Sequence, residues 1–365
     1  MNRSRLLIAV LFVVAQAVSV CAQTEVAEFR PGVTLDGVNY FLPKTCLRIV
    51  IEADKSVTTP GDFAPYANRY LRLAEVPTVP STTWTIRNVT IQPYGVPDAD
   101  KAFNIKLKTK TSAPLVSLTA DGLLIGVNTE VDPEQDAALP PTQPAPTPPN
   151  PRDYMTQEIL AAGSTAKMAQ LTAEEIYDIR DSRNALVRGE ADNTPKDGAQ
   201  LKLMLDNLDK QLAALESLFK GQTLVSREVM TLNYEPTAAD LTAGRVMVGR
   251  FSQRLGLVDA DDLSGEPLWL TLKTLSPLPV TEDNPDVARK KQKMEQGLRI
   301  NQPVRTQFTL GAAKQTYCTA EVPVAQFGTV EVLSDALFNK RLDTQVTIYQ
   351  HTGSVREITN DADGE

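Results

Sequence analysis

The stretch TCLRIVIE at residues 45–52 decides the fold class, because apolar and polar side chains alternate along it. Its leucine and isoleucines fall on one side of an extended chain, and Arg48 and Glu52 fall on the other. A period of two predicts a β-strand with one face against a core and one face in water. The stretch FNIKLK at 103–108 repeats the pattern. The N-terminal part of the chain is therefore expected to form a sheet.

Further strands are predicted on both sides of a central helical region. Asp121-Gly122 separates two short apolar runs and indicates a hairpin turn. After residue 224 the alternation returns, and we expect strands at 245–251, 268–272, 305–310, 314–322, 328–333 and 345–350. Residues 60–71 carry apolar side chains at helical spacing after a proline, which predicts one short helix packed on the N-terminal sheet.

Residues 165–220 carry the only long helical signal. Thr172 and Glu175 have the spacing of a capping box, and Gly189 indicates where a first helix ends. In the second helix the apolar steps alternate between four and three residues, at Leu201, Leu205, Leu208, Leu212, Leu215 and Phe219. This seam predicts an antiparallel αα-hairpin. Either the two seams bury each other and the adjoining sheet, or one is exposed for a partner helix.

The sequence thus predicts an α+β, mostly β protein, with two sheet-based parts flanking a long antiparallel αα-hairpin. The two sheet regions form either two domains or one merged core. Residues 133–151 contain eight prolines and predict an extended linker or surface loop. The expected parts are a signal peptide at 1–22, a β-rich part with one short helix at 23–132, the proline-rich segment, the hairpin at 152–221, a second β-rich part at 222–358 and an acidic tail at 359–365.

The first 22 residues predict export. Arg3 and Arg5 precede an apolar run, and small residues lie at the expected cleavage site, as in a secretory signal peptide. We expect cleavage between Ala22 and Gln23 and a location in the periplasm or at the outer membrane. The alternative is a lipid anchor on Cys21. No later stretch is long and apolar enough to form a transmembrane helix in the mature chain.

Export would leave Cys46 and Cys318 in a compartment where disulfides form. Each lies in an expected strand, one in each β-rich part. Two interpretations stand: two separate buried thiols that behave as small hydrophobic groups, or one disulfide that ties the two β-rich parts together.

Charge and composition exclude several function classes. The net charge is −8, and cleavage after Ala22 leaves 35 basic against 45 acidic side chains, whereas nucleic-acid binding requires a basic surface. With one histidine, His351, and three cysteines, the chain indicates no metal site and no cofactor. The acidic cluster at 259–266 resembles a calcium loop but has Leu263 where a ligand is required, so we expect a polar turn. No catalytic residue can be assigned.

Four stretches carry a resemblance to a known family: VNYFLPKT at 38–45, IYDIR at 176–180, GEADNTPKDG at 189–198 and VAQFG at 324–328. With these the chain resembles exported Bacteroidetes proteins grouped as domain of unknown function 4831. The resemblance covers most of the mature chain. It implies an envelope protein of a Gram-negative anaerobe and carries no catalytic residues.

These observations favour a non-enzymatic binding or assembly module of the cell envelope, because acid–base catalysis at neutral pH most often uses histidine. Its partner would be another envelope protein or a glycan. The alternative is a carboxylate-dependent glycan hydrolase, which needs two acids about 5–9.5 Å apart in one cleft. Trp84 and Trp269 are the candidate aromatic platforms for a sugar.

Overall fold

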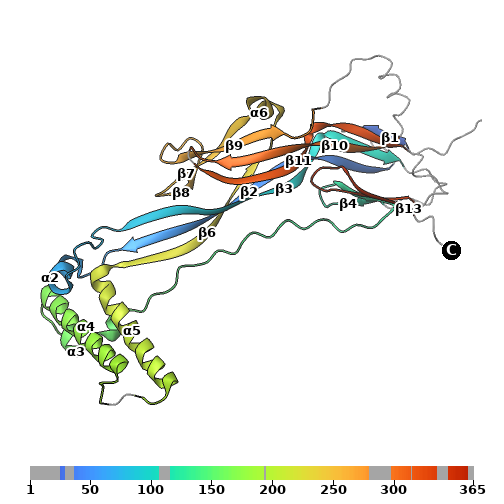
Figure 1. Ribbon diagram of the computed structural model, residues 1–365. Helices are drawn as coiled ribbons and strands as arrows, with labels where there is room; N and C mark the ends of the chain where they lie inside the picture. The colour runs from blue at the N-terminus through green and yellow to red at the C-terminus, as the bar shows by residue number, and fades with distance from the viewer. Residues whose placement is uncertain are drawn as a thin grey trace, which may run out of the picture.

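The computed structural model describes residues 25–28, 37–106, 116–192, 195–278, 297–313, 315–334 and 344–360. These residues form an elongated molecule with three parts (Figure 1). A body of packed β-sheets continues into a three-stranded ribbon, and the ribbon ends in a lobe of helices. We use body, ribbon and lobe in this sense below.

The first sheet runs through the body and forms the ribbon. Its strand order is β1-β3-β2-β6, and all its pairs are antiparallel. The bounds are β1 Glu25–Glu28, β2 Val38–Thr59, β3 Ser81–Lys106 and β6 Gln222–Tyr234. β2 and β3 pair from Val38 and Ile105 at one end to Thr58 and Ser81 at the other. The ribbon is the part of β2, β3 and β6 that extends beyond the other two sheets.

The two remaining sheets are also antiparallel. The second has the order β11-β10-β9-β7-β8, with β7 Arg245–Ser252, β8 Gly256–Val258, β9 Glu266–Thr274, β10 Gly297–Gly311 and β11 Thr316–Ser334. The third has the order β13-β12-β5-β4, with β4 Val116–Leu118, β5 Leu124–Val127, β12 Thr344–Ile348 and β13 Val355–Asn360. The predicted turn at Asp121-Gly122 joins β4 and β5, and Gly122 has a positive φ of 84°.

The two β-rich parts of the sequence share their cores. β6, which follows the helices, pairs with β2 over Leu47–Thr59. Residues of β2 and of the second sheet form one apolar cluster, with Ile49 and Phe308 both fully buried. A second cluster joins the start of β2 to the third sheet and to β10. The merged core, which the sequence left open, therefore describes this structure. The strand-rich character was predicted correctly, and the strands expected at 314–322 and 328–333 form one strand, β11.

The lobe has an apolar core of its own, separate from the body. It contains α2 Ala67–Leu71, α3 Gln157–Leu160, α4 Thr165–Arg188, α5 Gly198–Lys220 and two 3-10 turns, Ala64–Tyr66 and Pro151–Tyr154. Arg180 pairs with Glu216, and Arg183 with Asp209, so α4 and α5 run in opposite directions side by side. The helix predicted within 60–71 is present, but its expected packing was wrong. Phe63 and Leu71 pack against α4 and α5 rather than on the sheet.

The proline-rich segment is extended and runs alongside the ribbon from the third sheet to the lobe (Figure 1). It makes one strand-like contact, in which Gln143 and Arg227 of β6 exchange main-chain hydrogen bonds of 2.9 and 2.8 Å. Arg48 of β2 holds Asp136 of the segment at 2.8 Å. Proline lacks the amide hydrogen that a regular strand would need, which explains why the contact is limited to this one pair of residues.

One further helix, α6 Ala238–Ala243, follows β6. Among the described residues, no helix is long and apolar enough to cross a membrane. The expected signal peptide, its cleavage site at Ala22 and Gln23, the alternative anchor Cys21 and residues 361–365 of the acidic tail lie outside the described residues.

Candidate binding groove

The structure has a groove of about 880 Å³. It lies where the ribbon leaves the body, between β3 and one end of the second sheet. That end consists of the β7–β8 turn, the start of β9 and the β10–β11 turn. The groove is lined by Thr83, Trp84, Thr85, Ile86, Phe251, Ser252, Gln253, Arg254, Leu255, Ser264, Glu266, Leu268, Ala312, Gln315 and Tyr317.

The floor of the groove is β3, and it is fixed to the β7–β8 turn. The main-chain N–H of Trp84 donates a 2.7 Å hydrogen bond to the carbonyl of Gln253. Gly256 in the same turn has a positive φ of 84°, and a Cβ built there would lie 3.1 Å from the Trp84 indole. Only glycine allows the turn to come so close. The turn therefore covers one part of the indole, and Lys55 Nζ lies 5.3 Å from the ring centroid.

The walls of the groove are apolar at depth and mixed at the rim. Phe251 and Leu268 belong to the core of the body, so the groove is the open end of that core. Leu255, at the tip of the β7–β8 turn, is 59% exposed although its side chain is apolar. Burial raises the pKa of the Tyr317 hydroxyl, and the nearby charge of Glu266 adds to the increase. The remaining polar groups are mainly amides and hydroxyls.

Among the described residues that line this groove, Glu266 is the single carboxylate. The two carboxylates that a glycan hydrolase needs are therefore not both present in the lining of this groove. Two acids do line a smaller hollow of about 80 Å³, which lies beneath the proline-rich segment. There Arg48 holds Asp136 at 2.8 Å, and Arg356 lies 3.5 Å from Glu134. Both acids are thus already engaged with cations.

His351 lies in this smaller hollow, in the turn between β12 and β13. Burial lowers the pKa of its imidazole, and Glu134 opposes that shift. The neighbouring Gln350 accepts a 2.9 Å hydrogen bond from the main-chain N–H of Glu134. These contacts fasten the proline-rich segment to the third sheet.

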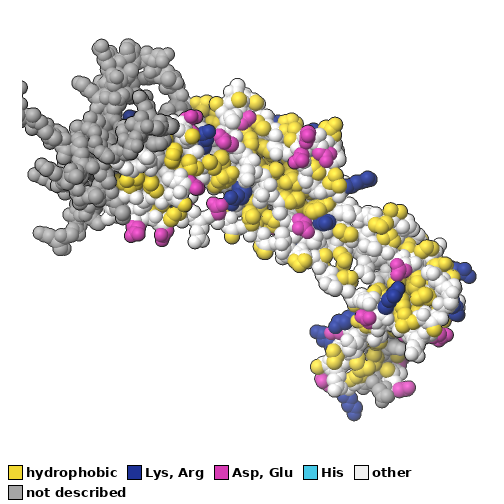
Figure 2. Space-filling model, turned by 180° about the vertical axis from the view of Figure 1, so that it is seen from behind, with side chains coloured by type: hydrophobic (Ala, Val, Ile, Leu, Met, Phe, Trp, Pro, Cys, Tyr) yellow, Lys and Arg dark blue, Asp and Glu magenta, His cyan; other side chains and the backbone are white. Residues whose placement is uncertain are grey.

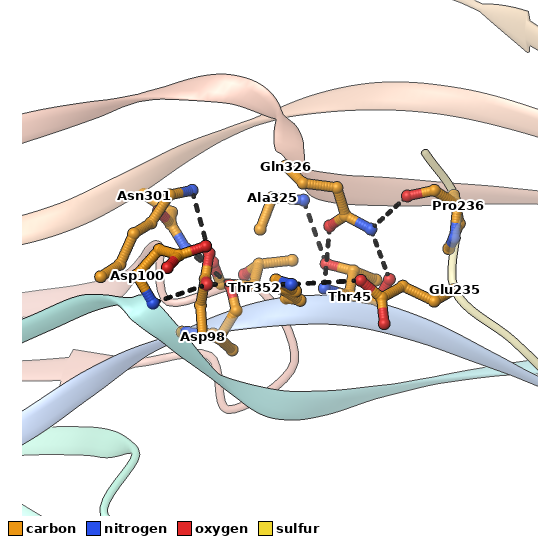
Figure 3. Close-up of polar contacts among 12 residues, drawn as sticks. Thr45, Asp98, Asp100, Glu235, Pro236, Asn301, Ala325, Gln326 and Thr352 are labelled. Carbon is orange, nitrogen blue, oxygen red and sulfur yellow. Dashed lines mark hydrogen bonds and ion pairs between the residues drawn. The ribbon is translucent and has the colours of Figure 1, made fainter. Parts of the chain in front are cut away.

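A buried polar cluster joins all three sheets within the body (Figure 3). Thr45 of β2 is fully buried, and its hydroxyl donates to the carbonyl of His351 at 2.8 Å and accepts from the N–H of Ala325 at 3.0 Å. The Gln326 side chain exchanges two 2.9 Å hydrogen bonds with the Thr45 main chain. It also donates to the carbonyl of Pro236. Because these hydrogen bonds connect residues of all three sheets, we interpret the cluster as a structural junction.

Asn301 and Asp98 complete the junction. The Asn301 amide donates to the carbonyls of Pro43 and Thr352, at 3.0 and 2.9 Å. The carboxylate of Asp98 lies 3.9 Å from Lys44 Nζ and 3.8 Å from Lys101 Nζ, and its side chain is only 6% exposed. The two lysine ammonium groups thus offset the negative charge of the Asp98 carboxylate, because burying an unpaired carboxylate is energetically costly.

The two cysteines are free thiols in the structure. Burial raises the pKa of Cys46 to about 11 and also raises that of Cys318. The Cys318 sulfur faces the N–H of Ile91, and Ile91 pairs with Ile49, three residues along β2 from Cys46. Three residues of a strand span about 10 Å, more than the Cα separation of a disulfide. No disulfide joins them here.

The structure separates the two tryptophans that the sequence singled out. Trp84 lines the groove, whereas Trp269 lies on the other face of β9, where Arg245 stacks at 4.3 Å from its ring centroid. The cluster at 259–266 forms a turn in which the Asp262 carboxylate accepts a 2.9 Å bond from the N–H of Ser264.

Sequence reasoning missed Phe251, Gln253, Leu255 and Tyr317 as residues of the groove. No local pattern marks them, because strand pairing far along the chain brings them together.

The fold and the groove define an antiparallel, strand-rich protein with a helical lobe and a hollow at the open end of its β-core. The family described as Domain of unknown function (DUF4831) matches residues 36–356, and the chain belongs to it. No curated protein and no solved structure matches the chain.

Proposed function

We propose that the protein is a non-enzymatic binding or assembly module of the cell envelope, and that the groove at Trp84 holds a polypeptide partner. One observation carries the proposal. The groove of about 880 Å³ opens onto the apolar core and has a strongly exposed leucine, Leu255, at its rim. An apolar side chain in that position loses contact with water when a partner covers it.

The groove favours a polypeptide over a glycan. Aromatic rings bind sugars through a free ring face, and part of each tryptophan ring is already in contact with a neighbour. Gly256 and Lys55 lie against Trp84, and Arg245 lies against Trp269. Amide side chains such as Gln253 and Gln315 beside apolar walls suit a protein surface.

The alternative is a carboxylate-dependent glycan hydrolase. It would have to use Glu266 with an acid from outside the groove lining, or acids of the smaller hollows beside the proline-rich segment, which Asp132, Glu134, Asp136 and Glu357 line. Purified protein incubated with a panel of envelope and dietary glycans tests this directly. Turnover that is lost in Glu266→Gln or in Glu134→Gln would overturn the binding proposal.

Co-purification from the native envelope tests the binding proposal itself. Leu255→Glu places a charge at the rim of the groove, while Leu263→Glu makes the same change at a side chain that is 83% exposed and does not line it. We expect Leu255→Glu to lose a stoichiometric partner that the wild type and Leu263→Glu both retain. Equal recovery of that partner with all three proteins would contradict the proposal.

Export is part of the proposal and rests on residues 1–22. We expect the exported chain to begin at Gln23, which intact-mass analysis of protein from the native host measures. A chain that begins at Cys21 with added acyl mass would instead identify a lipoprotein, and a chain that retains Met1 would remove the envelope from the proposal.

A further inference from the structure

The free edge of β3 lies beside the groove, and it differs from the opposite edge of the same sheet. β1 covers β3 only at Phe103–Lys106. On the opposite edge, Gln143 of the proline-rich segment pairs with Arg227 of β6. Unpaired strand edges attract other strands, and proteins usually cover them. Among the described residues, one edge of the ribbon thus carries a strand-like contact from the chain itself, whereas on the β3 edge no strand other than β1 pairs with β3.

Two main-chain N–H groups on the β3 edge already have partners, and the stretch of edge between them is called the gap below. At one end the Trp84 N–H is bonded to the Gln253 carbonyl, and at the other the Ile91 N–H faces the Cys318 sulfur. Trp84 therefore points its N–H away from β2. Because these directions alternate along an antiparallel strand, Ile86 points its main-chain groups the same way. The register with β2 shifts at the next residue, Arg87, and this β-bulge explains why Ile91, an odd number of residues from Trp84, also points its N–H outward. Among the described residues no main-chain hydrogen bond from Ile86 to another element is found on this edge.

The side chains around the gap define what could fill it. Trp84 and Ile86 both pack toward the core of the body and line the groove, with Tyr317 on the facing wall. A residue paired beside Ile86 would place its side chain on this same face, inside the groove. Its neighbours in sequence would point to solvent beside Thr85 and Arg87. The fitting segment is therefore short, extended and apolar at alternate positions.

Charge further defines the segment. Arg254 lines the groove and Lys55 lies against its floor, and neither forms an ion pair with a carboxylate in the part of the chain that the structure describes. Glu266 is the one opposing charge in the lining. With Lys55 counted, the groove has two cations without an ion pair among the described residues and one carboxylate, in a protein whose net charge is −8. Acidic residues at the solvent-facing positions of a partner would complement the two cations.

We propose that the partner contributes an extended, acidic segment with alternating apolar side chains, which adds to the edge of β3 at Ile86 by strand pairing. This inference rests on the proposed function, because it specifies how the same groove would hold its polypeptide. A segment of about five or six residues spans the gap between Trp84 and Ile91, since a strand rises about 3.3 Å per residue.

A displayed library of nine-residue peptides, selected on the wild-type chain and counter-selected on Leu255→Glu, supplies the probe. We expect the selected peptides to alternate apolar and polar residues with an excess of acids. The best peptide is then synthesised with and without N-methyl groups on the amides of one edge. Methylation is expected to weaken binding at least tenfold, because it removes the strand-pairing hydrogen bonds. Hydrogen exchange at residues 81–89 should slow only with the unmethylated peptide.

Protein variants provide a second measure. Ile86→Pro removes the outward N–H, while Ile86→Ala keeps it and shortens the side chain. We expect the proline variant to bind the peptide at least tenfold more weakly than the alanine variant. The N-methyl comparison does not depend on whether Ile86→Pro folds. Equal binding of methylated and unmethylated peptides, selected peptides without alternation, or a second copy of the chain in the groove would overturn the inference.

The two proposals fail in different ways. If Leu255→Glu abolishes co-purification of the native partner while N-methylation has no effect, the binding function stands and strand addition fails. If Leu255→Glu leaves co-purification unchanged, both proposals fail.

Discussion

Thr45 is the residue at which the three sheets meet. Its hydroxyl connects the carbonyl of His351 to the N–H of Ala325, and its side chain is fully buried. The sequence predicted the strand that contains it, because TCLRIVIE alternates. It did not predict the bonds, since His351 lies 306 positions away along the chain. Alternation reveals the face of a strand, whereas a polar junction depends on tertiary packing.

Thr45→Val tests this junction. Valine has nearly the same shape but leaves the His351 carbonyl and the Ala325 N–H buried without this partner, which should cost about 1–3 kcal/mol in the free energy of unfolding. Urea denaturation measures the loss. Thr309→Val is the matched control, because its hydroxyl bonds to Thr319 at an exposed site. A loss no larger than that of the control would contradict the role of Thr45.

His351 is expected to make stability depend on pH. Burial lowers its pKa in the folded state, so the folded protein favours the neutral imidazole. Stability is therefore complete above the unfolded pKa of about 6.5 and decreases as the pH falls below it. Urea titrations between pH 7.5 and 5.5 should show this decrease in the wild type and much less of it in His351→Gln. The same slope in both proteins would assign the effect to other groups.

The helices α4 and α5 show how far an element could be predicted from sequence. Their apolar spacing and the glycine after each helix were visible in advance. The packing of residues 60–71 against these two helices could not be predicted. Their apolar spacing predicts a helix whether it packs on the sheet or in the lobe, and only the fold decides which core it joins. In the structure the rings of Phe63 and Phe219 lie 5.4 Å apart in the core of the lobe.

Phe219→Ala should destabilise the lobe by about 3–5 kcal/mol, because it leaves a cavity at a fully buried position. Helical circular dichroism during denaturation follows the lobe. Leu203→Ala, on an exposed face of α5, is the control and should change little. An equal effect of the two substitutions would mean that the lobe lacks a packed core.

The proline-rich segment is the element most accessible to proteases. We expect limited proteolysis to cut first within residues 133–151, because few main-chain hydrogen bonds hold them. The cut protein should still migrate as one species in gel filtration, since β2, β3 and β6 connect body and lobe. Separation of the fragments, or an earlier cut within Leu201–Phe219, would contradict this arrangement.

At the scale of the whole molecule, long strands place the lobe far from the body and leave the end of the β-core open. The strand-rich class could be predicted from local alternation. The groove could not, because it arises where β3 continues past the end of the second sheet. On the face seen in Figure 2, acidic and basic side chains are interspersed rather than gathered by sign. Recognition by a large charged surface is not suggested there, which leaves the groove as the distinctive feature.

Site-specific photo-crosslinking in the native envelope tests the central claim most directly. A photoreactive amino acid is placed at Leu255 in one variant and at Leu263 in another, and the chains are irradiated in intact cells. The account predicts one discrete protein adduct from position 255 and none from position 263. Adducts of the same mass from both positions, or no protein adduct from position 255, would contradict the assignment of the groove as the partner-binding surface.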